Sequence, residues 1–504
     1  MESIIDSHTS VPTRTRLVEG SVVDGTGYQI AMIMGYSPRD PVMDQSNLSY
    51  QRKLLLSDGA SAVSQEIQTV TMNGNKFHST KLTYAQNTYP QEFTLENYDC
   101  IGFDLDHTLC RYKLKPLFHL IYKSLASFLI EKYEYPKFLA NISEDDWSFA
   151  QKGIVLDKYR GNFLKLNSLY KIVKASHGTQ LLSPKEISEI YGPNSIWEES
   201  KGIPQKLVTT ALEEPFYVFK DYFVTPGAII CAKLVDIIDK QEGKALKEYH
   251  FWDQYIEEFV KNPDLYIQPC PDSIKKWLEH IGQNKVTFLL TSANYDAAEF
   301  VASQCLGKDW KKYFDIVITF ARKPGFFWKD IPFYLVSGDE EVGNVKPEDF
   351  KSHLVYSQGN FKELQEVCAN LSKSKSPKTI YFGDSLIEDV YAASEIGGCD
   401  TVAIVEEMLA EGMVDLSEKH LESQVLTSKF WGSFFRNTIA ETHGNQGEDI
   451  TLWAHLLAQH SKLTIPNLES IAGLQMQDKI SCFGGDVPVS GYFPGVPKAL
   501  SIYC

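Results

Sequence analysis

The sequence lacks the features of a membrane-spanning, disulfide-linked or zinc-binding protein. No apolar run reaches the roughly 18 residues that a transmembrane helix needs. The nine cysteines contain no CxxC pair, and their odd number and wide spacing argue against a disulfide framework or a zinc module. The first residues form no apolar signal core and include several acids, unlike a secretory or transit peptide. We therefore expect reduced thiols and a cytoplasmic location.

A positively charged surface is also missing, since the 504 residues carry a formal net charge of -16 at pH 7. An acidic surface repels nucleic acid and anionic membranes, so we expect neither as the main partner. The hydrophobic content of 43% and the charged content of 23% are ordinary for a soluble globular protein, and the length predicts more than one domain. We expect a small-molecule substrate, and the sequence leaves a homo-oligomer open.

Short apolar runs that end in polar residues recur along the chain. They are "DCIGFDLD", "VTFLLTS", "FDIVITFARK", "KTIYFGDS" and "DTVAIV". The runs show no alternation, which is typical of parallel strands that are covered on both faces. Apolar residues at helical spacing follow several of them. The pattern predicts an α/β fold with a Rossmann-like, doubly wound parallel sheet, which would bind its ligand at the carboxyl ends of the strands.

The spacing of these runs predicts a chain of four parts. Asp104 and Thr291 lie too far apart for a single crossover connection, so we expect a large cap domain inserted after the first strand. A polar, turn-rich stretch at 328–352 is expected to be a surface insertion. The four parts are a weakly structured N-terminal extension (1–95), a catalytic core (96–120 and 281–425), the inserted cap (121–280) and a C-terminal segment packed on the core (426–504).

Two aspartates follow the first predicted strand, in "IGFDLDHTLC". Residues i and i+2 of an extended segment point the same way, so Asp104 and Asp106 would face one cavity. Two close carboxylates repel, and one would take up a proton unless a cation lay between them or their tasks differed. We expect one of them to attack or to hold a metal, and the other to carry a proton.

Polar residues after the later strands would complete this site. Asp384 and Asp389 in "GDSLIED" would approach the same sheet edge, and such carboxylates are hard oxygen ligands that suit Mg²⁺. Thr291 or Ser292 could donate a hydrogen bond to a phosphoryl oxygen, and Lys323 could neutralise its charge. This combination is what phosphoryl transfer through an aspartyl-phosphate needs.

The chain resembles a known family at these motifs. "DLDHTL" is similar to the DxDx[TV] signature of the haloacid dehalogenase superfamily, and "TFLLTS", "ARKP" and "GDSLIED" are similar to its other three motifs, in the same order. "GNFLKL", "SHGT", "PGA", "YSQGN" and "KFWGSFF" further resemble the 5'-nucleotidase domain-containing family. The resemblance covers about 96–495, and residues 1–95 lie outside it.

The resemblance implies roles for the acidic residues. Asp104 would be the nucleophile and a Mg²⁺ ligand. Asp106 would be the general acid and base, and its main-chain carbonyl would be a further Mg²⁺ ligand. Asp384 would be the third protein ligand, with Asp389 supporting the ligands from behind. The implied fold is haloacid dehalogenase-like.

The resemblance also implies how the substrate is held. Thr291 and Lys323 would bind the substrate phosphate, helped by Ser292, and Lys323 would also serve catalysis. The implied activity is the Mg²⁺-dependent hydrolysis of a phosphomonoester, namely a nucleoside 5'-monophosphate. Cytosolic purine nucleotidases read the base with an arginine, an aspartate and a histidine on a cap helix. The comparable stretch here, "YHFWDQYIEEFVKNPDLY", has no arginine, so purine specificity is not implied.

Two other functions stay open from the sequence. A low-activity member could act as a binding or scaffold protein, and a phosphotransferase could pass the phosphoryl group to a nucleoside. For His177 in "ASHGTQ" a structural role is favoured over substrate binding. Packing is likewise favoured over base stacking for the cap aromatics. These are Phe216, Tyr217, Phe219, Tyr222 and Phe223.

Overall fold

The computed structural model describes most of the chain from residue 92 onward. The described residues are 65–72, 75–82, 92–209, 214–241, 258–338, 340–416, 421–437, 449–484 and 489–503. Before residue 92 it describes an antiparallel hairpin of β1 (Gln65–Met72) and β2 (Asn75–Leu82). The other residues before 92 lie outside the described residues. None of the described helices is long and apolar enough to cross a membrane.

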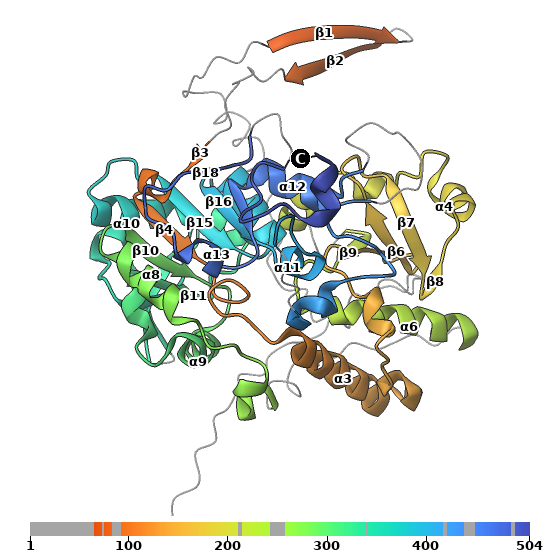
Figure 1. The fold of residues 1–504 in the computed structure, drawn as a ribbon, viewed down its shortest axis with the longest axis horizontal. Coiled ribbons are helices and arrows are strands. Elements are labelled where there is room, and N and C mark those ends of the chain that lie inside the picture. Colours follow the sequence, from red (N-terminus) through yellow and green to blue (C-terminus); the bar gives the residue numbers. More distant parts are fainter. Residues whose placement is uncertain are drawn as a thin grey trace, which may run out of the picture.

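A nine-stranded sheet forms the centre of the molecule (Figure 1). Its strand order is β13-β12-β14-β11-β10-β4-β15-β16-β17, and the seven strands from β14 to β17 are parallel neighbours. The parallel strands are β14 (Leu354–Gln358), β11 (Ile316–Thr319), β10 (Val286–Leu290), β4 (Cys100–Phe103), β15 (Thr379–Gly383), β16 (Asp400–Ile404) and β17 (Leu463–Ile465). The predicted parallel sheet is confirmed, and β4 lies at its middle.

One edge of the sheet comes from the stretch that was expected to be a surface insertion. β12 (Phe333–Ser337) and β13 (Glu340–Val345) form an antiparallel hairpin, and β12 pairs with β14. The polar residues of this stretch are exposed along β13 because it is the outermost strand. The expectation was therefore wrong for this hairpin, which extends the sheet.

The central strands pack closely because Gly102 has no side chain. In the register of the sheet, Gly102 lies between Phe288 on β10 and Tyr381 on β15. The rings of Phe288 and Tyr381 stack across it, with centroids 6.2 Å apart and planes inclined by 4°. A Cβ on Gly102 would lie 2.1 Å from the Phe288 ring, so only glycine fits here.

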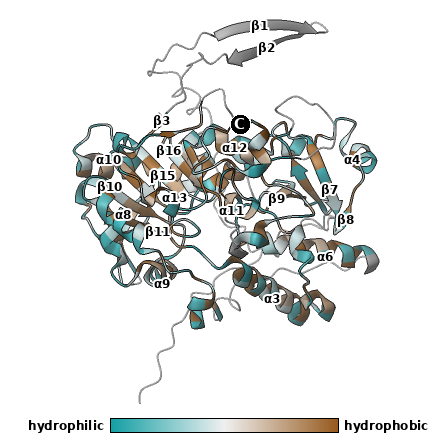
Figure 2. Ribbon diagram, viewed as in Figure 1, coloured by the Kyte–Doolittle hydropathy of each residue, from teal (hydrophilic) through white to brown (hydrophobic). Residues whose placement is uncertain are grey.

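Helices cover both faces of the sheet, as a doubly wound fold requires. Side chains of α8 (Asp272–Gly282) and α9 (Tyr295–Leu306) pack in one buried cluster with strand residues such as Phe103. Those of α10 (Phe361–Ser372) and the π-helix η10 (Leu386–Ile396) pack in a second cluster with Phe288. Figure 2 shows apolar residues in the central strands and a mixture of apolar and polar residues along helices such as α8 and α10. The fold is α/β with a doubly wound sheet.

A second, antiparallel sheet is built between β4 and β10. Its order is β8-β7-β6-β5-β9, and it lies on the far side of the centre from α10 (Figure 1). The strands are β5 (Val155–Asp157), β6 (Asn162–Leu166), β7 (Ile172–His177), β8 (Gln180–Leu181) and β9 (Phe216–Val218). The helices α3 (Leu114–Tyr133) and α6 (Thr225–Gln241) pack together beside it. The chain thus carries a cap inserted after the first strand of the parallel sheet.

The C-terminal segment contacts both parts. β17 extends the parallel sheet, while Lys165 of the cap donates hydrogen bonds to the carbonyl oxygens of Trp431 at 2.8 Å and Ser433 at 2.5 Å. In return, Trp431 Nε1 donates to the carbonyl of Phe149, and Trp453 Nε1 donates to the carbonyl of Gly153. These bonds connect the cap to the C-terminal segment, which also contributes β17 to the parallel sheet.

Candidate active site

Four neighbouring parallel strands end at the same edge of the sheet, where the predicted site residues follow them. Asp104 comes directly after β4, and its main-chain N–H donates to the carbonyl of Phe382 on β15. Asp384 follows β15, Thr291 follows β10, and Lys323 lies four residues after the end of β11. Because parallel strands present their carboxyl ends on one side, residues from distant parts of the sequence meet there.

Lys323 connects two of the carboxylates. Its Nζ lies 2.7 Å from Asp104 Oδ1 and 2.6 Å from Asp389 Oδ1, and 3.0 Å from the Tyr381 hydroxyl. Burial alone would lower the pKa of Lys323, but the charges of Asp104 and Asp389 outweigh it and raise this pKa well above its usual value. Lys323 is therefore a fixed positive charge next to Asp104.

Asp104, Asp384 and Asp389 form a buried acidic cluster. One carboxylate oxygen of each lies within 4.8 Å of the others. Burial is the largest cause that raises the pKa of all three, and the charge of Asp389 raises the pKa of Asp104 and Asp384 further. Asp384 Oδ2 is buried without a hydrogen-bond partner in the described part of the chain. The cluster holds more negative charge than Lys323 neutralises.

The position of Asp389 depends on Gly383. Asp389 lies in the first turn of η10, and its Oδ2 accepts a hydrogen bond from the Ser385 N–H at 3.1 Å. A Cβ on Gly383 would lie 2.3 Å from the Asp389 Cβ, so the missing side chain lets the carboxylate approach the strand end. Asp389 thus lies beside Asp104 and Asp384, and Lys323 connects it to Asp104.

Asp106 faces a different partner. The hydroxyl of Tyr112 donates a short hydrogen bond to Asp106 Oδ1. Burial raises the pKa of Asp106, and the hydrogen bond from Tyr112 opposes this rise. The two aspartates of the first motif thus have separate environments, Asp104 with Lys323 and Asp106 with Tyr112.

Thr291 and Ser292 shape the turn after β10. The buried Thr291 Oγ1 accepts a hydrogen bond from the Ala293 N–H at 3.1 Å, and Ser292 Oγ accepts one from the Lys323 N–H at 2.9 Å. Ser292 thereby fixes the main chain of Lys323. The structure brings both residues to the same strand ends as Asp104, with hydroxyls that also hold the local backbone.

Lys152 is a buried cation near the site that the sequence did not reveal. Its Nζ lies 3.6 Å from Glu407 Oε2 and 4.2 Å from the centroid of the Tyr222 ring, and the Tyr222 hydroxyl donates to Glu407 at 2.6 Å. Its charge lowers the pKa of Asp384 against the larger effect of burial. Lys152 and Tyr222 come from the cap, so the cap contributes charge and contacts here. A lone lysine before a glycine carries no signal for this role.

The weaker candidates lie elsewhere or are packed. His177 bonds to Asn162 Oδ1 and Asp239 Oδ2, both in the cap, which agrees with a structural role. Packing is confirmed for the buried Phe216, Phe219 and Tyr222. Tyr217 is half-buried, and Phe223 contacts the rings of His107 and Tyr112 beside the site. Of the stretch without arginine, residues 249–257 lie outside the described residues.

Comparisons with known proteins show the family of the chain. A family model described as the 5' nucleotidase family matches residues 89–429. The chain belongs to this family. It is 33% identical to human 5'-nucleotidase domain-containing protein 1 over 453 residues, which cover 82% of this chain and 98% of the human protein. The corresponding protein of Bos taurus is also 33% identical, over 449 residues, with the same coverage.

The family assignment confirms the resemblance seen in the motifs. This 5'-nucleotidase family member is accordingly a phosphatase-like enzyme whose substrate the comparisons leave unspecified. Among solved structures, a haloacid dehalogenase-like hydrolase from Streptococcus pneumoniae aligns over 61% of this chain and 85% of its own, with 11% identity and a TM-score of 0.23. At this TM-score the similarity supports no inference, so the fold rests on the sheet topology described above.

Proposed function

We propose that the chain is a Mg²⁺-dependent phosphomonoester hydrolase that acts on a nucleoside 5'-monophosphate through an aspartyl-phosphate intermediate. The observation that carries the proposal is the position of Lys323 between Asp104 and Asp389, at the ends of the parallel strands. The nucleotide substrate is supported by the names of the relatives, which refer to a 5'-nucleotidase domain.

The acidic cluster fits a divalent cation. Three buried carboxylates lie within reach of a single ion, and Asp384 Oδ2 lacks a hydrogen-bond partner among the described residues. Oxygen donors without nitrogen or sulfur ligands are the set that Mg²⁺ prefers. Asp104 and Asp384 would hold the ion together with the main-chain carbonyl of Asp106, and Asp389 would support them through Lys323. When bound, Mg²⁺ would neutralise the charge that develops on the phosphoryl oxygens.

The first step would transfer the phosphoryl group to the chain. A carboxylate oxygen of Asp104 attacks the phosphorus, and the bond between phosphorus and the ester oxygen breaks. Asp106 donates its proton to that ester oxygen, so the nucleoside leaves as a neutral alcohol. Lys323 stays within hydrogen-bond distance of Asp104 and keeps its positive charge next to the new acyl phosphate.

The second step would release phosphate. Asp106, now a carboxylate, takes a proton from water while the water oxygen attacks the phosphorus. The bond between phosphorus and the Asp104 oxygen breaks, which gives inorganic phosphate and restores both side chains to their starting states. The different partners of the two aspartates support these separate roles, since Asp104 binds Lys323 and Asp106 binds Tyr112.

We also propose that two parts of the chain have separate tasks. The catalytic core is formed by 96–120 and 281–425, and the inserted cap (121–280) selects the leaving group. The contacts of Lys152 and Tyr222 with Glu407 support this division. The charge of Lys152 also acts on Asp384, which supports a role of the cap next to the acidic cluster.

A phosphatase screen tests the proposal. The purified chain, with Mg²⁺, is offered nucleoside 5'-monophosphates, sugar phosphates and an aryl phosphate, and phosphate release is measured beside Asp104→Asn. We expect nucleoside monophosphates to be hydrolysed by the wild type alone. Equal background in both proteins would overturn the proposal and favour a binding or scaffold role. Transfer to an added nucleoside in place of phosphate release would favour the phosphotransferase.

A further inference from the structure

Tyr112 is the direct partner of the aspartate that carries the proton. Its hydroxyl donates a short hydrogen bond to Asp106 Oδ1, although six positions separate the two residues. A tight turn brings them together, because the His107 N–H donates to the Cys110 carbonyl and the Cys110 N–H donates to the Leu105 carbonyl, both at 2.8 Å. Tyr112 is 1% exposed, so water does not replace this contact.

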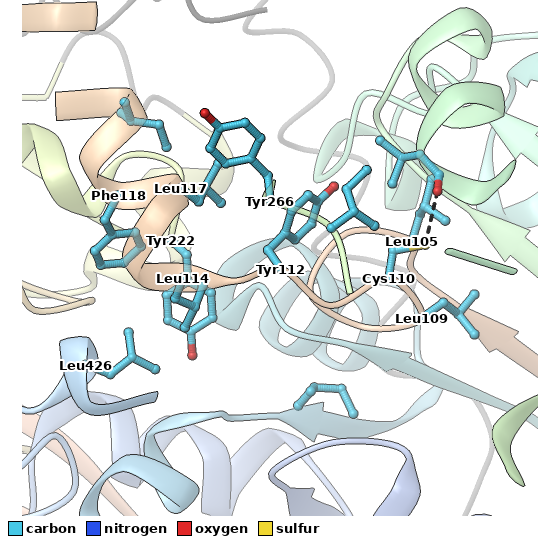
Figure 3. Packing of buried hydrophobic residues seen from close by; sticks show 14 of the residues in the cluster. Leu105, Leu109, Cys110, Tyr112, Leu114, Leu117, Phe118, Tyr222, Tyr266 and Leu426 are labelled. Atoms are coloured by element: carbon cyan, nitrogen blue, oxygen red, sulfur yellow. Dashed lines mark hydrogen bonds between the residues drawn. The ribbon is translucent and has the colours of Figure 1, made fainter. Parts of the chain in front are cut away.

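The ring of Tyr112 is held in place from several sides. The Gln268 side chain donates to the main-chain carbonyl of Tyr112 at 2.9 Å. Around the ring, the centroid of His107 lies at 4.7 Å, that of Phe223 at 5.6 Å and that of Phe259 at 6.2 Å. Figure 3 shows Tyr112 among other buried hydrophobic side chains of the core, including Cys110 and Leu114. Buried, close-packed rings have few alternative orientations, so the hydroxyl stays directed at Asp106.

We propose that Tyr112 is a positioning residue that decides which oxygen of Asp106 carries the proton. The inference rests on the proposed function. Since the Tyr112 hydroxyl donates to Oδ1, that oxygen acts as an acceptor and Oδ2 is left to bear the proton that is given to the leaving group. Without the hydroxyl, Asp106 can rotate and either oxygen can bear the proton. General acid catalysis depends on this geometry first.

The importance of Tyr112 should depend on the leaving group. The ribose alcohol of a nucleotide is a very weak acid, so it needs a proton as the phosphorus–oxygen bond breaks. The 4-nitrophenolate ion is stable without a proton. Losing the hydroxyl of Tyr112 should therefore slow cleavage of the nucleotide much more than cleavage of 4-nitrophenyl phosphate.

Tyr112→Phe with Tyr266→Phe as a matched control tests this inference. Both tyrosines pack against Phe259, but the hydroxyl of Tyr266 donates to Glu258 Oε1, at 3.5 Å. With enzyme in excess, we measure the first turnover of a nucleoside 5'-monophosphate and of 4-nitrophenyl phosphate. Y112F should slow the nucleotide reaction about 10- to 100-fold and the aryl reaction by less than about 3-fold. Y266F should change neither rate.

A double variant shows whether Tyr112 acts through Asp106. In an Asp106→Asn background, adding Y112F should cause little further loss of the nucleotide rate, because the group that Tyr112 orients is gone. Thermal unfolding of every variant is measured alongside, so a general loss of folded protein is seen directly.

The outcomes separate this inference from the proposed function. No turnover by the wild type of any phosphomonoester would overturn the proposed function, and this inference with it. Wild-type turnover combined with equal losses on both substrates in Y112F, or with no loss, would overturn this inference alone. This inference would also be overturned if Y112F slowed the nucleotide reaction as much in the D106N background as in the wild type. A loss confined to the nucleotide and absent in D106N supports it.

Discussion

Lys323 Nζ lies 2.7 Å from Asp104 Oδ1, and this ion pair joins the end of β11 to the end of β4. Both side chains are almost fully buried, at 3% and 10% exposure. Lys323 also pairs with Asp389, so it is the cation that separates two carboxylates in the acidic cluster. The relationship explains how the first motif tolerates an aspartate in a buried position.

Replacing Lys323 by methionine should abolish most of the activity. The variant removes the positive charge beside the attacking oxygen, and losing one preorganised electrostatic contact of this kind costs about 100- to 1000-fold in turnover. The protein should also be less stable in EDTA, because two buried carboxylates lose their partner. Turnover and urea unfolding measure the two effects. Lys312→Met is the control, since its ion pair with Glu279 is half-exposed and contributes little. Wild-type turnover in K323M would contradict this role.

Asp384→Asn should weaken Mg²⁺ binding without lowering the stability of the metal-free protein. Asp384 is buried among like charges, and one of its oxygens has no hydrogen-bond partner among the described residues, so neutralising it should leave the stability in EDTA unchanged or higher. The wild type should gain thermal stability as Mg²⁺ is added, because a ligand that binds the folded state stabilises it. D384N should lose that gain, whereas Asp296→Asn, at an exposed aspartate of α9, should keep it. A Mg²⁺-dependent shift that persists in D384N would argue against the cluster as the metal site.

The sequence predicted the strand ends of this site, since apolar runs followed by polar residues mark parallel strands without knowledge of the cap. It could not predict the path of the chain between strands. Tyr112 reaches Asp106 only because the turn at Cys110 and the bridge from Tyr112 to Ile267 set that path. Lys152 contacts Glu407 because the cap packs against the core at this point, and no local sequence pattern predicts that packing.

Four strands of the sheet also escaped prediction, for local reasons. β14 reads "LVYSQ" and begins with the exposed Leu354, so its short buried part resembles a loop. β17 has three residues, too few for a period to be recognised, and its place beside β16 is decided by tertiary packing. The hairpin of β12 and β13 was missed because polar side chains suit an edge strand as well as a loop.

Gly102→Ala should destabilise the protein by disturbing the centre of the sheet. The new Cβ would lie 2.1 Å from the Phe288 ring, and such overpacking costs about 1–3 kcal/mol or more of unfolding free energy. Activity should fall as well, because Phe288 stacks on Tyr381, whose hydroxyl touches Lys323 Nζ. Gly473→Ala is the matched control, since nothing lies within 4 Å of the added carbon. Equal stability of the two variants in urea unfolding would show that the strands can shift apart.

Glu411 should make stability depend on pH in a defined window. Its carboxylate accepts hydrogen bonds from Ser433 Oγ and the Phe434 N–H, both at 2.5 Å, and burial raises its pKa from 4.5 to about 7. The folded state therefore holds a proton that the unfolded chain releases. Between pH 4.5 and 7 stability should fall as pH rises, by up to about 1.4 kcal/mol per pH unit.

Variants of Glu411 and of Lys165, which donates to the Ser433 carbonyl, separate two pH windows of stability. Glu411→Gln cannot titrate, so urea unfolding should show a flatter dependence between pH 4.5 and 7. Burial lowers the pKa of Lys165 from 10.5 to about 7, so the folded state binds that proton more weakly and stability should rise between pH 7 and 10.5. Lys165→Met should remove this upper slope. Because the charge of Lys165 lowers the pKa of Glu411, K165M should also extend the lower window to higher pH. If E411Q abolished the upper slope and K165M the lower one, the assignment of the two groups would be wrong.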